Sequence, residues 1–480
     1  MQMDLINSIL GNVSDFMYTY ILIIMLIAVG LYFSFRTKFV QFRLFPEALR
    51  VLSEKKKDGK DISSFQALMI STASRVGTGN IAGVATAVAA STAIGGYGAI
   101  FWMWLLALIG AASAFIESTL AQLYKHKNGD EFVGGPAYYI QKGLKSRKLG
   151  IVFSVLLIAC FAYGFNALQS FNAGSALKYY IPNYDSSIWP FVVGAILALL
   201  TALTIFGGVH RISGLVSAVV PIMAFIYIGL GLYITFTNLD AVPDMFSKIF
   251  KQAFDYKAVF GGFAGSCVMQ GIKRGLYSNE AGMGSAPNAA AAAEVSHPVK
   301  QGLVQMLSVF IDTILICSTT AFMLLLSGVP IDENLKGMDY VQSAVYNQVG
   351  SFGPLFITIS IFLFAFSSLV GNYYYTESNF KFIKESKKGL FVFRCTCIIA
   401  IFAGALLDFT TVWTVADILM GLMAIVNLIA IVLLGRKAIA ALKDYQSQRR
   451  DGKDPVFIAE NTNTGDPEVW NKEHTKKWKN

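Results

Sequence analysis

The chain contains a succession of apolar runs, each about as long as one bilayer crossing. Backbone groups cannot stay unpaired in hydrocarbon, so only helices or closed barrels cross a membrane. A window of about 20 residues predicts helices at 17–35, 63–94, 98–122, 150–178, 188–207, 212–237, 256–284, 300–327, 352–377, 389–408 and 411–435. The sequence therefore predicts an all-α polytopic membrane protein with about eleven transmembrane helices.

The composition narrows the class of function. The 480 residues are 55% hydrophobic and only 14% charged, which departs from the balance of a soluble domain. The net charge of +9 comes from basic residues in short loops and in the tail, a distribution that argues against nucleic-acid binding. All five cysteines lie in apolar runs, and no serine hydrolase triad, zinc-protease motif or Walker lysine is present. We expect neither an enzyme nor a metal centre.

Loop charges predict the orientation in the membrane. The loops after the first and third predicted spans are rich in Lys and Arg, so they are expected to be cytoplasmic. This places the N-terminus outside, and an odd number of crossings places the basic C-terminus inside. After Tyr445 the tail has few apolar clusters, and we expect a short helix followed by disorder.

Glycines interrupt two of the predicted spans. The second span contains Gly77, Gly79 and Gly83, and the seventh contains Gly261, Gly262 and Gly265. Paired interrupted helices in corresponding halves are typical of inverted-repeat transporters. The predicted organisation is an extracellular N-terminus (1–16), an extra first span (17–35), a basic cytoplasmic loop (36–62), two five-helix repeats (63–237 and 238–435) and a cytoplasmic tail (436–480).

The first interruption, Ser71 to Gly83, is the leading candidate for a binding site. Its G-x-G-x-x-A pattern also fits a dinucleotide fingerprint, but the flanking residues are predicted spans rather than a βαβ unit. Close helix packing at glycines is a second alternative. In a broken helix, the N–H groups of Thr78 to Asn80 would face an anion, and the carbonyls before them would face a cation.

A second conspicuous run, Gly271 to Pro287, follows the interruption in the seventh span. Lys273, Arg274 and Glu280 in this run are predicted either to gate the cytoplasmic mouth by ion pairing or to be interfacial charges. The alanines at 289–293 predict a small helix packed against the inner surface.

These two runs, at 71–83 and 273–287, resemble the signatures of the alanine or glycine:cation symporter family, and the apolar layout is similar along nearly the whole chain. The resemblance implies sodium-driven uptake of alanine, glycine or serine across the plasma membrane by alternating access. It also implies the five-plus-five inverted repeat of the leucine-transporter type, with two broken helices. The pattern Gly77-x-Gly79-Asn80 is similar to the broken first core helix of the neurotransmitter:sodium symporters.

The resemblance also implies roles for single residues on the second and ninth spans. The N–H groups of Thr78 and Gly79 would bind the substrate carboxylate, and the carbonyls of Ala73 and Val76 would contribute to a sodium site. The run from Phe364 to Ser368 in span nine would complete that site with the hydroxyls of Ser367 and Ser368, because an alkali cation requires oxygen ligands. The alternative is that both serines bond back to their own helix.

Two further spans are expected to contact the substrate. Phe260, Gly262 and Phe263 would offer carbonyls to its ammonium group and an aromatic wall to its side chain. Phe165 and Gln169 lie in a run similar to the family's substrate-facing helix, although a buried amide also commonly pairs with a neighbouring helix. Asn372 stands where many members of the family have an aromatic residue, which predicts a roomier, more polar pocket that accepts a longer substrate such as glutamine.

The ionisable residues within predicted spans include Arg75, Glu117, Asp312 and Asp408, and a charge there is costly and has a partner or a role. We expect Arg75 to pair with Asp312 or Glu117. Asp312 is also an alternative proton or second cation site, so proton coupling is the main competitor to sodium coupling. A channel is less favoured, because two broken helices suit a closed-off site. The expected partners are the amino acid, co-transported sodium and the lipid bilayer, for a functional monomer without an organic cofactor.

Overall fold

A computed structural model describes residues 2–54, 62–90, 96–129, 131–207, 209–255, 266–332, 335, 337–462, 464, 468–471 and 478. The described chain is almost entirely helical. Its one described sheet is a hairpin of β1 (His126–Asn128) and β2 (Glu131–Val133), paired antiparallel with His126 opposite Val133.

The main helices of the first half are α1 (Gln2–Met17), α2 (Ile23–Arg36), α3 (Val40–Arg43), α4 (Phe45–Leu52), α5 (Ser64–Arg75), α6 (Ala82–Ala90), α7 (Gly98–Leu123), α8 (Pro136–Gly143), α9 (Arg147–Ile158), α10 (Asn166–Ser175), α11 (Trp189–Ile205) and α12 (Val209–Thr237). Those of the second half are α13 (Val242–Ala253), α15 (Cys267–Asn279), α16 (Pro287–Ala292), α17 (Pro298–Val309), α18 (Ser318–Leu325), α19 (Gly337–Val349), α20 (Phe352–Ile383), α21 (Lys387–Gly404) and α22 (Phe409–Arg450).

Helices occupy all eleven predicted span positions. Seven stretches of the described chain are long and apolar enough to cross a membrane: Asn7–Arg36, Gly98–Leu123, Arg147–Ser175, Gly214–Thr237, Pro298–Leu325, Phe352–Ile383 and Phe409–Arg450. Shorter helices fill the other positions: α5 with α6, α11, α15 and α21. The first helical stretch starts at Gln2 rather than at residue 17, because α1 continues into α2 through a π-helical turn, η1 (Tyr18–Leu22).

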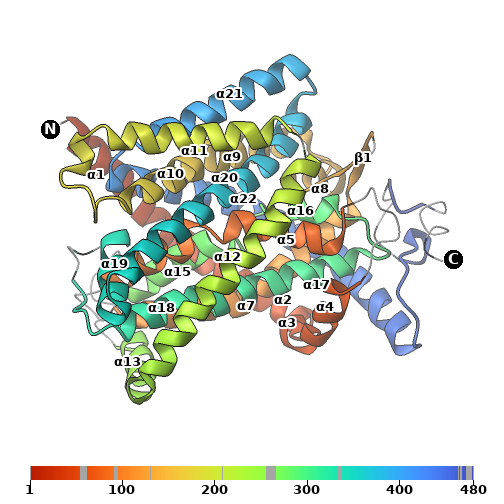
Figure 1. Cartoon of the computed structure of the whole chain (residues 1–480). Helices are drawn as coiled ribbons and strands as arrows, with labels where there is room; N and C mark the ends of the chain where they lie inside the picture. Colours follow the sequence, from red (N-terminus) through yellow and green to blue (C-terminus); the bar gives the residue numbers. More distant parts are fainter. Residues whose placement is uncertain are drawn as a thin grey trace.

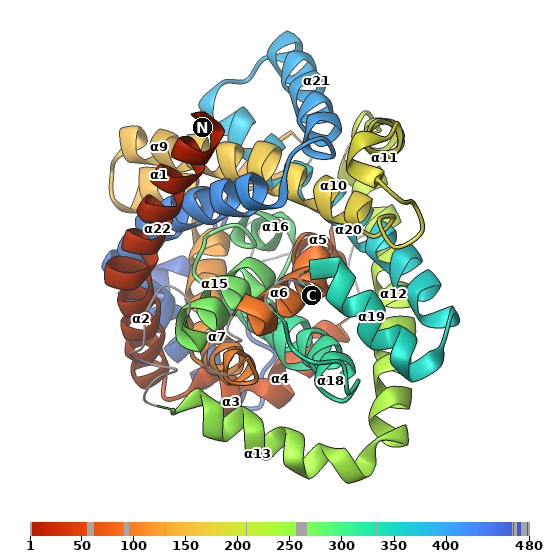
Figure 2. The ribbon, with the colours of Figure 1, turned by 90° about the vertical axis from the view of Figure 1, so that its left-hand side faces the viewer.

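The termini lie at opposite ends of the bundle (Figure 1), as an odd number of crossings requires. Viewed from the N-terminal end, α5, α6 and α15 occupy the centre, while α11, α21 and α13 lie at the periphery (Figure 2). The long helix α7 packs against α15, α17 and α2. The central helices are therefore shielded from the surroundings of the bundle.

The second predicted span is broken in the middle. α5 ends at Arg75, a single 3-10 turn, η2 (Thr78–Asn80), follows, and α6 begins at Ala82. The predicted interruption of the seventh span, with Gly261, Gly262 and Gly265, lies outside the described residues. The helix that follows it, α15, begins with Ser266 as its N-cap, whose hydroxyl accepts from Met269 N–H at 3.1 Å.

Two other π-helical turns interrupt helices next to this break: η4 (Ala159–Phe165) between α9 and α10, and η8 (Phe310–Cys317) between α17 and α18. A π-turn shifts the register of the side chains that follow it and is frequent at functional sites. Here η4 precedes Gln169, and η8 contains Asp312.

The tail begins with a helix, as predicted, but the disorder predicted after that helix is wrong for the described tail residues. α22 continues to Arg450, and beyond it Phe457 and Trp470 are buried. Phe457 N–H donates to Ser296 O at 2.9 Å, and the Trp470 indole donates to Gln122 O at 2.8 Å. The low apolar content of the tail gave no sign of this docking, because two isolated aromatics are enough when a preformed surface receives them.

Candidate functional site

The break between α5 and α6 is fully buried and held open by local contacts. Val76 leaves the helical conformation, and Gly77 is extended with φ −130° and ψ −157°. Asn80 Oδ1 accepts from Gly77 N–H at 3.0 Å, which satisfies a backbone donor that an unbroken helix would have paired. The unwound segment predicted from the glycines is confirmed.

Two glycines are required here by close approach. A Cβ on Gly77 would lie 2.3 Å from Ser368 Oγ and 2.7 Å from Gln169 Nε2. A Cβ on Gly79 would lie 2.7 Å from the ring of Tyr277. The break is therefore tightly enclosed by side chains of α20, α10 and α15.

On one side of the break, backbone carbonyls meet a hydroxyl of α20. Ser368 Oγ donates to Ala73 O at 2.9 Å and lies 3.5 Å from Val76 O. Three of the oxygens expected around sodium thus converge. Ser367 instead donates back to Phe364 O at 3.0 Å, so the alternative of a bond to its own helix describes this hydroxyl.

On the other side, the turn η2 that precedes α6 meets amides from α10. Thr78 N–H donates to Gln169 Oε1 at 3.0 Å, and Asn172 Nδ2 donates to Thr78 Oγ1 at 2.9 Å. Gln169 Nε2 donates to the Tyr277 hydroxyl at 3.2 Å. The Gln169 oxygen thus occupies the position that a carboxylate would take on Thr78 N–H.

An aromatic pair covers this part of the site. Phe165 contacts Tyr277 edge to face, with ring centroids 4.7 Å apart, and both side chains are buried. The predicted aromatic and carbonyl contacts from Phe260, Gly262 and Phe263 lie outside the described residues.

Asn80, which was predicted to contact the substrate, connects the break to Asp312. Its Nδ2 donates to Asp312 Oδ1 at 2.7 Å and to Ser278 Oγ at 3.0 Å. Ser278 and Thr313 hydroxyls donate to Asp312 Oδ2 at 2.5 and 3.0 Å. Asp312 is therefore a fully hydrogen-bonded carboxylate directly beside the break.

The predicted pairing of Arg75 with Asp312 or Glu117 is not formed. Among the described residues Arg75 donates only to Gln305 O, at 3.4 Å, and its Nε and Nη2 reach no acceptor there. Glu117 instead accepts from Gly282 N–H at 3.2 Å and Gly284 N–H at 3.1 Å. The positive φ of both glycines creates a turn whose N–H groups compete successfully for this carboxylate.

The predicted gate of Lys273, Arg274 and Glu280 does not form as one set. Arg274 pairs with Asp417 at 2.6 Å, and Lys273 pairs with Asp15 at 3.1 Å. Asp417 lies on α22 and Asp15 on α1. The two cations of α15 thus pair with acidic residues on neighbouring helices rather than with Glu280.

Glu280 and Asn372 belong to a separate polar cluster below the break. Asn372 Nδ2 donates to Asn166 Oδ1 at 3.0 Å, and both Asn372 Oδ1 and Glu280 Oε1 lie within hydrogen-bond distance of Ser74 Oγ, at 2.7 and 2.9 Å. The described contacts of Asn372 are thus with the protein itself, one helical turn beyond Ser368.

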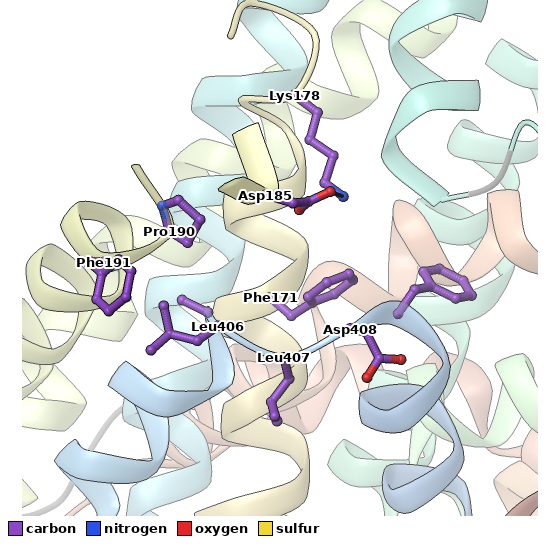
Figure 3. A pocket seen from close by; sticks show the side chains of 10 residues that line it. Phe171, Lys178, Asp185, Pro190, Phe191, Leu406, Leu407 and Asp408 are labelled. Atoms are coloured by element: carbon purple, nitrogen blue, oxygen red, sulfur yellow. Dashed lines mark hydrogen bonds and ion pairs between the residues drawn. The ribbon is translucent and has the colours of Figure 1, made fainter. Parts of the chain in front are cut away.

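A cavity of about 540 Å³ opens near the N-terminal end. Figure 3 shows Lys178 and Asp185 pointing toward each other on one side of it, with Asp408 on another. At its base, the ring centroids of Phe171 and Phe409 lie 6.2 Å apart. The Trp413 ring continues this series of contacts, with its centroid 6.0 Å from that of Phe409 and 5.4 Å from that of Tyr277. These aromatic side chains separate the cavity from the break.

Several residues of the site were missed in the sequence: Tyr277, Asn172, Ser74, Ser278 and Thr313. Tyr277 and Ser278 lie in the run from Gly271 to Pro287, and Asn172 follows Gln169 at helical spacing. These signals were available, but which face of each helix meets the break depends on packing.

The comparisons with known proteins agree with this architecture. A family profile described as the sodium:alanine symporter family matches residues 3–459. The chain is 49% identical over 455 residues to the amino-acid carrier protein AlsT of Bacillus subtilis, with 95% of both chains covered. It is 45% identical to the probable sodium/glutamine symporter GlnT of the same organism (95% of this chain, 94% of the relative) and 37% identical to the sodium/alanine symporter AgcS of Methanococcus maripaludis (92% and 98%).

Among solved structures, that of a mutant of the Eremococcus coleocola manganese transporter is similar with a TM-score of 0.52. The match has 12% identity and covers 85% of this chain and 92% of that one. At this identity the likeness concerns the fold alone, which is that of a multi-pass membrane transporter of the leucine-transporter type. With its profile match over nearly the whole length and these relatives, the chain belongs to the sodium:alanine symporter family.

Proposed function

We propose that this protein couples the inward movement of sodium to the uptake of a small neutral amino acid across the plasma membrane. The observation that carries the proposal is the buried break between α5 and α6. There, backbone carbonyls meet Ser368 on one side, and a backbone N–H meets Gln169 on the other. In this proposal the N-terminus is outside, the C-terminus is cytoplasmic, and the working unit is a monomer.

Sodium would bind where Ser368 now bonds to Ala73 O and Val76 O. Rotation of one hydroxyl hydrogen frees three oxygens for a cation. Ser367 Oγ is on the neighbouring residue, and Phe364 O, to which it donates, is on the preceding turn of α20. The C-terminal end of α5 also directs its partial negative charge toward this point. An alkali cation is therefore favoured there without an acidic ligand.

The amino acid would bind on the opposite side of the break. Its carboxylate would accept from the N–H groups of Thr78 and Gly79, beside Asn80, and would displace Gln169 Oε1 from Thr78 N–H. The Gln169 amide would then turn to donate to it. The close approach of Phe165 and Tyr277 to the break would favour a short side chain such as that of alanine, glycine or serine. Glutamine remains in the proposed range because the 45% identical relative is named a probable glutamine symporter.

The driving force is sufficient for accumulation. One sodium ion crossing about 100 mV releases about 2.3 kcal/mol, and a tenfold concentration gradient adds about 1.4 kcal/mol. One ion per cycle can thus sustain a substrate gradient of several hundredfold.

Uptake into proteoliposomes tests the proposal. Labelled alanine, glycine, serine and glutamine are offered in turn, while the sodium and proton gradients are imposed independently. We expect saturable uptake that needs inward sodium and persists without a proton gradient. Uptake that is independent of sodium would contradict the proposal, and unitary currents without saturable substrate coupling would indicate a channel.

Proton coupling through Asp312 is the second candidate. The observation in its favour is a buried carboxylate linked by Asn80 directly to the break, so a charge change at Asp312 would be felt at Gly77. If acid outside drives uptake in the absence of sodium, and Asp312→Asn abolishes that uptake, this candidate replaces the first.

A further inference from the structure

Three buried carboxylates surround the inner half-helix α5, and their donors differ. Glu117 accepts from two backbone N–H groups and from Asn427 Nδ2 at 2.7 Å. Asp312 accepts from the Asn80 amide, whose orientation is fixed because its oxygen accepts from Gly77 N–H. These donors cannot reverse their roles, so both carboxylates are satisfied in the ionised form.

The donors around Glu280 are set by a chain of amides. Asn166 Nδ2 donates to Ala162 O at 3.2 Å, and a backbone carbonyl can only accept. Asn166 Oδ1 must therefore accept from Asn372 Nδ2, which leaves Asn372 Oδ1 facing Ser74 Oγ at 2.7 Å. The single hydroxyl proton of Ser74 is committed to Asn372.

Glu280 Oε1 lies 2.9 Å from the same Ser74 oxygen, and this contact then has no proton from the serine. Its other oxygen, Oε2, is 2.5 Å from Ser285 Oγ. A hydrogen bond between Glu280 and Ser74 exists only when the acid donates it. We infer that Glu280 is a proton-binding site of this transporter, carrying a proton on Oε1 in this conformation and donating it to Ser74.

Burial without a direct ion pair supports a neutral acid. Glu280 is 1% exposed, and no ion pair reaches it within the described residues. Arg75 on α5 favours the ionised form and Asp312 on η8 opposes it, and Cys160 on η4, Tyr277 on α15 and Tyr375 on α20 also face Glu280. Glu117 on α7 binds the same turn. The single positive charge of Arg75 can balance only one of the three carboxylates. Glu117 and Asp312 are hydrogen-bonded by donors of fixed orientation, and Glu280 is not.

The proton has a mechanical consequence. The proton joins Ser74 on α5 to Glu280 in the turn between α15 and α16. Ser74 directly follows the proposed sodium ligand Ala73. When the proton leaves to water, the Glu280 and Asn372 oxygens compete for one serine proton, and this bridge weakens. The place of this step in a cycle rests on the proposed symport, whereas the protonation of Glu280 does not.

Infrared difference spectroscopy of the purified full-length protein tests the inference. On alkaline titration, the wild type is expected to lose a protonated-carboxyl C=O band and gain a carboxylate band. Glu280→Gln keeps the shape and donates an N–H to Ser74, so it should fold and lack that band. Asp312→Asn is the matched control and should retain it. A band of unchanged intensity in Glu280→Gln, or one lost only in Asp312→Asn, overturns the inference.

A second readout separates this inference from the proposed function. Sodium-dependent substrate binding is expected to fall by up to about tenfold per pH unit on the alkaline side for one essential proton, and Glu280→Gln should lose this dependence. Identical pH profiles in both proteins contradict the role of Glu280. If neither protein binds an amino acid with sodium, the proposed function fails, and the infrared result still decides the protonation.

Discussion

At the residue scale, the site depends on positions where a side chain would occupy space used by another. Gly77 is the clearest case, because its missing Cβ leaves room for Ser368 and Gln169 at once. The glycine pattern predicted an interruption, but it could not show that α10 and α20 both approach this one residue.

We predict that Gly77→Ala abolishes sodium-dependent uptake. The added Cβ would overlap Ser368 Oγ at 2.3 Å, and relief of such overpacking costs about 1–3 kcal/mol and displaces the neighbour. Labelled-alanine uptake in proteoliposomes measures the effect. Gly229→Ala on α12, where nothing lies within 4 Å, should retain uptake, and normal transport by Gly77→Ala would show that the break tolerates a side chain.

Ser368→Ala is expected to raise the sodium concentration for half-maximal uptake. If one oxygen ligand contributes roughly 1 kcal/mol to sodium binding, its loss raises that concentration about fivefold. Sodium titrations of uptake measure this shift, with Ser360→Ala, two turns earlier on α20, as the control. An unchanged sodium titration in a folded Ser368→Ala protein would remove this hydroxyl from the cation site.

At the scale of elements, the turn between α15 and α16 is held by α7 and α22. Glu117 and Asn427 both bind it, and Asn427 Nδ2 donates to Gly282 O at 2.9 Å as well as to Glu117. The positive φ of Gly282 and Gly284 makes their N–H groups converge on one carboxylate. Glu117 is thus an anchor for the turn that carries Glu280.

We therefore predict that Glu117→Gln destabilises the protein. The new NH₂ group would face a backbone N–H or the Asn427 amide, and one buried donor would stay unpaired at about 1–3 kcal/mol. Thermal unfolding in detergent should show a lower midpoint. Asp244→Asn, which removes an exposed pair with Lys248, should leave the midpoint nearly unchanged; equal stability of both variants would refute the anchor.

At the scale of the whole molecule, the described tail connects several helices and loops at the C-terminal end of the bundle. Lys300 at the start of α17 pairs with Asp454 at 3.1 Å and Glu54 at 2.9 Å, and Glu468 pairs with Lys142 at 2.5 Å. Residues distant in sequence thus meet on one surface.

His297, just before α17, makes this assembly sensitive to acid. Burial lowers its pKa and outweighs the opposing effect of Asp444, 3.1 Å away. Its Nδ1 accepts from Val299 N–H at 3.2 Å, so a second proton would remove the helix cap. Because the unfolded chain binds this proton more readily, stability should be complete above about pH 6.5 and decline below it.

Thermal unfolding across this pH range measures the effect. His297→Asn keeps a capping acceptor but cannot titrate, and it should flatten the acid limb of the stability profile. An acid limb of equal steepness in the variant would assign the dependence to other groups.

The sequence by itself determined the helical membrane fold, the positions of the spans and the break at Gly77. Bilayer-length apolar runs allow no other spanning structure here, and the clustered glycines of the second span weaken its helix where the break occurs. Only the tertiary structure decided which partners the buried polar groups have: Glu117 with backbone N–H groups instead of Arg75, Arg274 with Asp417, and Ser74 between Asn372 and Glu280. A hydrogen bond forms over about 3 Å between residues more than a hundred positions apart. Helix rotation and π-turns set that distance, which periodicity alone does not reveal.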